Sequence, residues 1–91
     1  MSASLQAHAG NGVTVVVNGT PTTVAVTGNP TLLKIVTAAL SQTQNSGQPV
    51  ENWELRGPDD VPIADLNQKF HALHLKPGEV LYLNLRAGIG G

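Results

Sequence analysis

The sequence predicts an α+β domain, in which one helix packs across a mixed sheet of about four to five strands. Three observations indicate this fold. A β-branched run over residues 13–17 is followed by Asn-Gly, the preferred pair for a tight hairpin turn. An aliphatic segment with helical spacing follows at residues 32–40. The last apolar segment, residues 80–85, carries leucine at alternate positions and reads as a buried strand.

The first two predicted strands, residues 13–17 and 20–26, form a hairpin. A two-residue loop places Pro21 where its missing N–H points away from the partner strand. Proline is tolerated there at the edge of a sheet, so we expect the second strand to be an edge. Val16 then faces outward. The same register predicts four buried side chains: Val13, Val15, Val24 and Val26.

The helix is expected to begin at Asn29 as N-cap, with Pro30 at the first helical position. Its end is expected near Gly47, a plausible residue for the left-handed position after a helix. A chain break is also indicated by the proline that follows at position 49. The expected inner stripe of the helix comprises Leu32, Val36, Ala39 and Leu40.

The sequence pattern in the second half of the chain predicts three more strands. Residues 52–56 alternate and put Trp53 and Leu55 inward, and residues 61–63 form a very short edge strand. An irregular connection over 65–75 leads to the last strand, which we expect at the centre of the sheet and parallel to the first. The leucines expected on one face of that last strand are Leu81, Leu83 and Leu85.

Composition limits the function classes. The chain has 91 residues, enough for one domain. With a net charge of −1 and few basic residues, it lacks the footprint of a nucleic-acid binder. It has no apolar run of about 18 residues, so we expect no membrane span. We divide it into a flexible N-terminal segment (1–11), a folded domain (12–86) and a flexible glycine-rich tail (87–91).

The absence of cysteine excludes disulfides, thiolate metal sites and a cysteine nucleophile in this chain. It fits a cytoplasmic protein, and no secretory signal is visible. His71 and His74 are three residues apart, but no third ligand stands at a matching spacing, so we interpret them, with His8, as surface histidines. Asp59-Asp60 with Asp65 lacks the alternating oxygen ligands of a calcium loop and is better explained as a turn than as a cation site. We therefore expect no metal.

The chain ends at Gly90-Gly91. Glycine has no Cβ, so a tail of this kind is thin and can enter a narrow slot. Such a tail suits a protein whose own C-terminal carboxylate, that of Gly91, is the reacting group. On composition alone a frayed end explains the glycines equally well.

The order of elements and the final Gly-Gly resemble the β-grasp of ubiquitin and its relatives. The similarity covers about residues 12–91, and residues 75–86 look like ubiquitin's final loop and strand. Leu85-Arg86 matches the Leu-Arg that opens ubiquitin's tail. The resemblance implies a β-grasp, ubiquitin-like fold.

A closer resemblance is to a family of short bacterial ubiquitin-like proteins. It rests on residues 17–21 (Val-Asn-Gly-Thr-Pro), residues 48–56 (Gln-Pro-Val-Glu-Asn-Trp-Glu-Leu-Arg) and residues 87–91 (Ala-Gly-Ile-Gly-Gly). That family is encoded beside an activating-type (adenylating) enzyme, a conjugating-type enzyme and a JAMM-type peptidase, and some such operons act in defence against phage. The resemblance implies a protein modifier that is not itself an enzyme and has no cofactor, because the activating enzyme uses the ATP.

The resemblance also implies roles for individual residues. Gly91 and Gly90 would form the conjugating end, linked to an unidentified target protein. The residues that partner enzymes would recognise are Arg86, Ala87, Gly88 and Ile89. Chain formation would use a lysine acceptor, and the candidates are Lys34, Lys69 and Lys76. For each lysine, ordinary solvation is the plainer explanation.

Two departures from ubiquitin change the expected partners. The tail has one more residue between Arg86 and the last glycine, and it lacks ubiquitin's second arginine. Glu54 occupies what looks like the position of the central isoleucine in ubiquitin's hydrophobic patch. Eukaryotic ubiquitin-binding domains are therefore not the expected partners, and we expect the bacterial enzymes to use a different surface.

Two other functions stay open. A sulfur carrier shares the fold and the Gly-Gly end, but its last glycine becomes a thiocarboxylate. A noncovalent adaptor or self-assembling scaffold would have an inert tail and would use its apolar surface, to which the outward Val16 contributes. The Trp53 segment and the long connection over 57–75 favour the modifier over the sulfur carrier.

Overall fold

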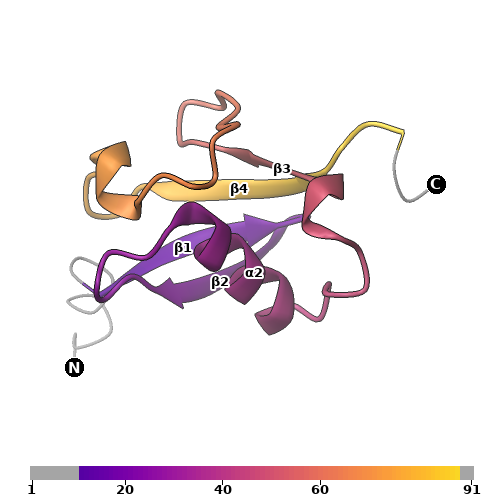
Figure 1. The fold of residues 1–91 in the computed structure, drawn as a ribbon, viewed down its shortest axis with the longest axis horizontal. Coiled ribbons are helices and arrows are strands. Elements are labelled where there is room, and N and C mark those ends of the chain that lie inside the picture. Colours follow the sequence, from indigo (N-terminus) through magenta and orange to yellow (C-terminus); the bar gives the residue numbers. More distant parts are fainter. Residues whose placement is uncertain (1–10, 89–91) are drawn as a thin grey trace.

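A computed structural model describes residues 11–88. Within this range the chain forms four strands, one α-helix and two 3₁₀-helices (η), which are shown in Figure 1. In chain order they are β1 (Gly12–Val17), β2 (Thr20–Ala25), α2 (Leu32–Gln42), η1 (Val50–Asn52), β3 (Trp53–Arg56), η2 (Phe70–Leu73) and β4 (Val80–Leu85).

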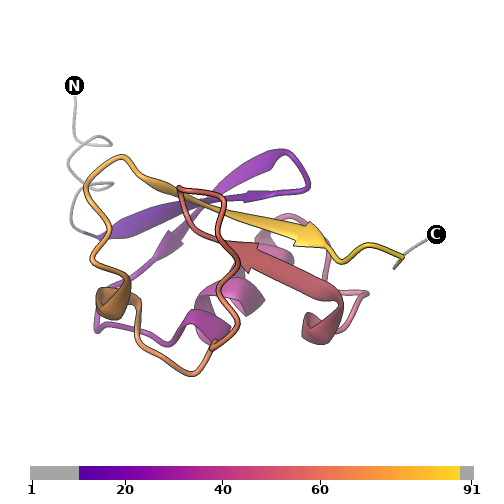
Figure 2. The same cartoon turned by 90° about the horizontal axis from the view of Figure 1, so that it is seen from above.

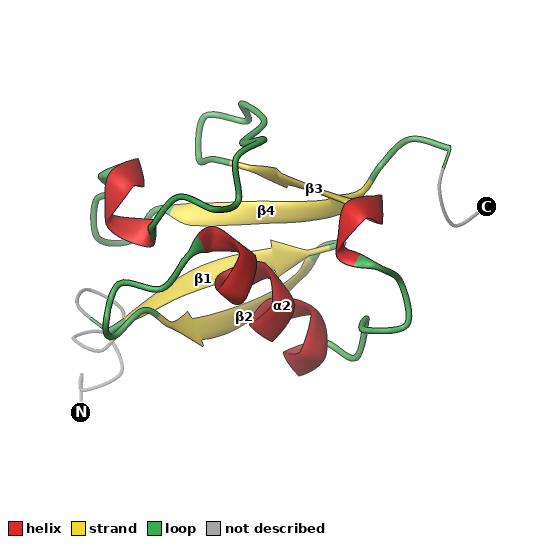
Figure 3. Cartoon of the chain, in the orientation of Figure 1, coloured by secondary structure: helices red, strands yellow, loops and turns green. Residues whose placement is uncertain are grey.

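The predicted α+β fold is confirmed. The strands form a mixed sheet in the order β2-β1-β4-β3, and α2 packs across one face of it (Figures 1 and 3). The last strand, β4, lies next to β1 and parallel to it, as expected. The pairs β1–β2 and β3–β4 are antiparallel. This arrangement is the β-grasp, and the described chain enters and leaves the sheet at opposite ends along the strand direction (Figure 2).

The hairpin has the predicted register. Val17 pairs with Thr20, Val16 pairs with Pro21, and β2 is an edge of the sheet. Asn18 and Gly19 both have positive φ (47° and 88°), as a tight turn of the hairpin type requires. The four valines expected to be buried are all at most 5% exposed.

The helix boundaries differ from those predicted. The N-cap is Thr31, whose side-chain oxygen accepts a hydrogen bond from the backbone N–H of Lys34 at 3.2 Å. Asn29 is instead left-handed (φ 55°), and its side chain accepts from the backbone N–H of His71 at 2.8 Å, in the first turn of η2. Asn29 therefore caps a helix, but one that is 42 residues away in the sequence.

The helix also ends before Gly47. Gln44 is the left-handed residue (φ 62°), and its N–H donates to the Ser41 carbonyl at 3.1 Å. The N–H of Asn45 donates to the Leu40 carbonyl at 2.7 Å. This pair of bonds is a Schellman motif, which satisfies the last carbonyls of the helix without glycine. Gly47 has no part in it.

The core lies between α2 and the inner face of the sheet. Trp53 and Leu55 are buried as expected, and so is the whole predicted stripe of α2. Ile35, which the predicted stripe leaves out, is also fully buried. The Nε1 of Trp53 is the one buried side-chain polar atom of residues 11–88 without a hydrogen-bond partner. Leu85 is half-buried at the margin of the core.

The expected strand over residues 61–63 is reduced to a single bridge between Pro62 and Arg56. Two backbone hydrogen bonds flank the bridge: Gly57 N–H to the Val61 carbonyl at 3.0 Å, and Ile63 N–H to the Leu55 carbonyl at 2.8 Å. This segment therefore covers the outer edge of β3 at its carboxyl end, along residues 55–57. The connection over 65–75 is less irregular than expected, because it contains η2.

Candidate functional site

The glycine-rich tail begins at the end of a central strand. β4 runs between β1 and β3, and the tail leaves at its carboxyl end (Figure 1). Because β1 and β4 are parallel, this is also the end where the β1–β2 hairpin turns. The two segments are joined there, since the N–H of Asn18 donates to the Leu83 carbonyl at 2.9 Å. The tail thus starts from a rigid base.

Arg86 pins the root of the tail to η1. Its backbone N–H donates to the Asn52 carbonyl at 2.8 Å, and its side-chain Nε donates to the Glu51 carbonyl at 2.9 Å. A guanidinium offers further N–H donors, which make no hydrogen bond to the other described residues. Arg86 is exposed. It can therefore hold its own backbone with one group and contact another molecule with the rest.

Ala87 and Gly88 follow Arg86 in a turn, and both are exposed. Gly88 has a φ of +85°, and a Cβ placed on it would meet nothing within 4 Å. Glycine is favoured here by backbone conformation, because other residues pay a steric penalty at positive φ. The remaining predicted tail residues, Ile89, Gly90 and Gly91, lie outside the described residues.

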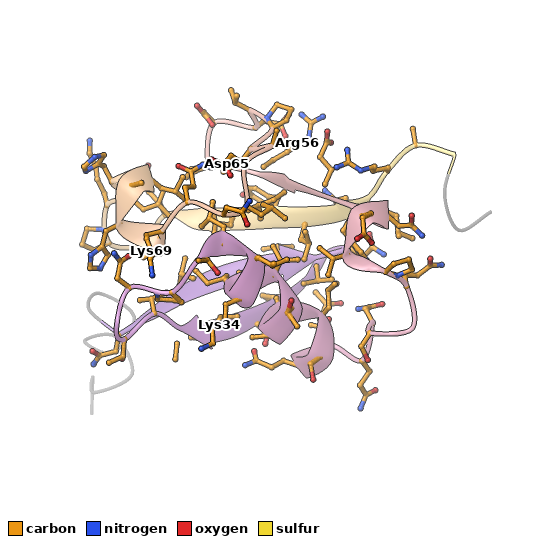
Figure 4. All side chains as sticks on the ribbon, viewed as in Figure 1. Lys34, Arg56, Asp65 and Lys69 are labelled. Carbon is orange, nitrogen blue, oxygen red and sulfur yellow. The ribbon has the colours of Figure 1, made fainter. Side chains whose placement is uncertain are left out.

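The face of the sheet opposite α2 carries a polar network on β3. Arg56 Nε lies 2.9 Å from a carboxylate oxygen of Glu54, and Arg56 Nη1 donates to the Asp60 carbonyl at 2.8 Å (Arg56 is labelled in Figure 4). Arg56 is also paired in register with Tyr82, which in turn is paired with Val16. A charged pair therefore stands on this face of the sheet.

Sequence reasoning missed this network, although a signal was present. Glu54 and Arg56 are two residues apart on a strand, so they share a face, and their charges are opposite. No sequence signal marks the two carbonyls that hold Arg86, because every residue has a backbone carbonyl.

The three candidate acceptor lysines are exposed, and none forms an ion pair with a described residue. Lys34 projects from α2 and Lys69 lies just before η2 (Figure 4). Lys76 is in the turn before β4, where its backbone N–H donates to the side chain of Glu79 at 2.8 Å. Lys69 stands at the end of the sheet away from the root of the tail (Figure 4), and Lys76 precedes the start of β4, at the same end.

No three histidine, aspartate or glutamate side chains within residues 11–88 gather as a metal site would require. His71 and His74 are exposed, and His74 is the left-handed residue (φ 52°) that ends η2. His8 lies outside the described range. In the same range no helix is both long and apolar enough to cross a membrane.

Comparison with known proteins places the chain in a family. A family described as "Protein of Unknown function (DUF2604)" matches residues 8–91. The chain is also similar to the uncharacterized protein y4jI of Sinorhizobium fredii (strain NBRC 101917 / NGR234), with 38% identity over 79 residues. The match covers 87% of this chain but 60% of that relative. Since the family match takes in nearly the whole chain, the protein belongs to the DUF2604 family.

Proposed function

We propose that this protein is a ubiquitin-like modifier whose Gly91 carboxylate is joined to a target protein by partner enzymes. The observation that supports this most is the root of the tail. A central strand ends in an arginine held at two points, and the exposed residues that follow need glycine at position 88. Such a base fixes the point at which the tail leaves the sheet, which suits the entry of a thin tail into an enzyme slot.

The chemistry belongs to the partners. An adenylating enzyme joins the Gly91 carboxylate to the α-phosphate of ATP and releases pyrophosphate. A cysteine thiolate of that enzyme then displaces AMP and forms a thioester, which passes to a conjugating-type enzyme. A nucleophile of the target, or a lysine of a second copy, finally displaces the thiol. A JAMM-type peptidase would cleave the product or expose Gly91. The chain itself supplies no catalytic residue and no cofactor.

The tail must be recognised as well as threaded. We assign recognition to the free N–H groups of Arg86, together with Ala87, Gly88 and Ile89, and conjugation to Gly90 and Gly91. We place the reaction in the cytoplasm, where ATP is available, and defence against phage is the setting that we infer.

The test is reconstitution with the adenylating and conjugating-type enzymes of the same organism and ATP. We expect a thioester with the full chain and none after deletion of Gly90-Gly91. A chain lacking Ser2-Ala3 is the matched control, since it loses two residues at the other terminus. Thioester formation by the tail-deleted chain would refute the proposal.

Mass spectrometry of the protein from its native host decides among the alternatives. A covalent adduct ending at Gly91 supports the modifier. The mass gain of an oxygen-to-sulfur exchange at Gly91 would instead identify a sulfur carrier. Full biological activity after blocking of the Gly91 carboxylate would identify a noncovalent adaptor, and either of these outcomes contradicts our proposal.

A further inference from the structure

A pocket lies between the segment that follows β3 and the segment that leads into β4, and its volume is about 320 Å³. This is the small end of the range for ligand pockets, which is about 300–1,000 Å³. Its walls are bonded in place, since residues 57–63 are joined to β3 and η2 precedes the turn before β4. We call it the acidic pocket. The residues that line it are Gly57, Pro58, Asp59, Val61, Ile63, Leu73, Leu75 and Glu79.

Most of the lining of the acidic pocket is apolar. Ile63, Leu73 and Leu75 pack against the margin of the core and are only half-buried. Val61 is 53% exposed, more than any other large hydrophobic side chain of residues 11–88. Apolar surface gains free energy when it is removed from water. These four side chains therefore offer a hollow in which an aliphatic group of another molecule can be buried.

Two carboxylates, those of Asp59 and Glu79, are the charged groups among the described lining residues. Asp59 is exposed and Glu79 is half-buried, and neither forms an ion pair with a described residue. Each is oriented by a backbone N–H. Asp59 Oδ1 accepts from Val61 at 3.3 Å, and Glu79 Oε1 accepts from Lys76 at 2.8 Å. The pocket therefore presents two negative charges from two different segments of the chain.

The cations of the adjoining segments are placed elsewhere. Arg56 is engaged by Glu54 and Asp60 (Arg56 is labelled in Figure 4). Lys76 lines a separate cavity, which residues of β1 and η2 also line. A lysine or arginine of another molecule that approached the acidic pocket would therefore meet negative charge that no described cation of the lining offsets.

The acidic pocket and the root of the tail lie at opposite ends of β4. Gly57 follows the last residue of β3, which is paired with Tyr82 near the start of β4. Glu79 comes directly before β4, whereas Arg86 comes directly after it (Figure 1). A molecule seated in the pocket therefore leaves the root of the tail uncovered.

We propose that the acidic pocket binds a partner protein through aliphatic side chains that are flanked by lysine or arginine. The aliphatic groups pack on Val61 and on the half-buried side chains behind it, and the cations contact Asp59 and Glu79. Apolar burial supplies affinity, while charge complementarity orients the partner and speeds its association. The interaction is noncovalent, goes beyond the proposed function and does not depend on conjugation at Gly91.

The probe is a capped peptide, acetyl-Lys-Lys-Leu-Ile-Lys-Lys-amide, titrated into the full chain at low salt and followed by NMR. We expect saturable binding with a Kd below about 1 mM. The amide signals of Gly57, Val61 and Glu79 should shift most. A peptide with glutamate in place of each lysine should bind about tenfold more weakly, because its charges oppose those of the pocket. A peptide with serine in place of leucine and isoleucine should also bind about tenfold more weakly, because it loses the apolar contact.

Variants at exposed or half-buried side chains test each contact and leave the core in place. Val61→Ser removes apolar area and should weaken binding about fivefold. Asp59→Asn and Glu79→Gln should each weaken binding about threefold, and the double variant about tenfold. Asp65→Asn is the matched control and should leave binding unchanged. Asp65 is an exposed carboxylate outside the pocket, and it likewise accepts from a backbone N–H two residues later, at 3.0 Å.

A variant that fills the pocket gives an independent test. A Cβ placed on the buried Gly57 would lie 3.0 Å from Asp59 Oδ1 and 3.8 Å from Ile63 Cδ1, two side chains of the lining. The φ of Gly57 is not positive, so the backbone accepts alanine. Gly57→Ala should therefore keep the fold, displace the Asp59 side chain and weaken binding about threefold. Thermal unfolding checks that each variant is folded.

Several results would overturn the proposal: no saturable binding, equal binding of the glutamate or the serine peptide, or shifts confined to residues outside the pocket. Unchanged binding by Val61→Ser, or an equal loss from Asp65→Asn and Asp59→Asn, would reduce the contact to a general attraction between opposite charges. Pocket signals that shift with protein concentration in the absence of peptide would identify a second copy as the occupant instead. Deletion of Gly90-Gly91 should leave peptide binding intact, which separates this site from the proposed conjugation.

Discussion

The two edge strands of the sheet, β2 and β3, differ in how far their outer edges are covered and charged. The β3 edge is covered by the segment that follows it, through the bridge from Arg56 to Pro62, and it carries the charges of Glu54, Arg56 and Asp60. Within residues 11–88 no segment pairs with the outer edge of β2, and β2 has no charge. A covered, charged edge cannot accept another strand, while an open, neutral one can. Of the two edges, that of β2 therefore leaves more backbone groups available to a further strand.

The prediction with the largest expected effect removes a core side chain that packs beneath the covered edge. Leu55 is 2% exposed and fills the core beneath β3. Leu55→Ala should lower the free energy of unfolding by about 3 kcal/mol, from lost burial and the cavity left behind. Val61, on the covering segment, is 53% exposed, so Val61→Ala should cost about 0.5 kcal/mol or less. Urea denaturation measures both, and equal losses would mean that Leu55 does not hold this edge.

One proline substitution at each edge allows the stability of the two edges to be compared directly. The N–H of Ile63 donates to the Leu55 carbonyl at 2.8 Å, so Ile63→Pro removes a bond that covers β3. We expect a loss of about 2 kcal/mol. Thr23→Pro removes an N–H that bonds to no described residue, and we expect less than about 1 kcal/mol. Thermal unfolding of the two variants gives the comparison. A greater loss from Thr23→Pro would show that the β2 edge is occupied in the free chain.

The smallest expected effect concerns charge. Glu54 and Arg56 are each about one-third exposed, so their ion pair is partly screened. Glu54→Gln should cost about 0.5 kcal/mol at low salt and less at high salt. Glu51→Gln is the control, because only the backbone carbonyl of Glu51 takes part in a hydrogen bond with a described residue. Urea titrations at two salt concentrations would reveal the difference, and a salt-independent loss for Glu54→Gln would exclude an electrostatic origin.

Local chemistry explains why parts of the fold could be predicted. The Asn18-Gly19 turn and Pro21 together allow one register of the hairpin, and that register is observed. The helix boundaries were wrong because their determinants are not local. Asn29 has the residue type of an N-cap, but its side chain accepts a hydrogen bond from the backbone N–H of His71, which is distant in the sequence. Thr31 caps α2 in its place.

Parts of the candidate site could likewise be predicted from the sequence, and parts could not. The glycines of the tail are visible in the sequence, and so is the pattern that makes β4 a buried strand. The attachment of Arg86 to the carbonyls of Glu51 and Asn52 is not, because a carbonyl is common to all residues and only the meeting of β4 with η1 selects these two. The roles of Gly90 and Gly91 stay a prediction.

By itself, the sequence determined the hairpin, the presence of the helix, most of the inward side chains and the class of fold, because turn chemistry and hydrophobic period act between near neighbours in the chain. Only the tertiary structure decided which edge of the sheet is covered within residues 11–88 and which carbonyls hold Arg86. Those features arise where segments distant in sequence meet or fail to meet, and no local pattern of residues encodes such a contact.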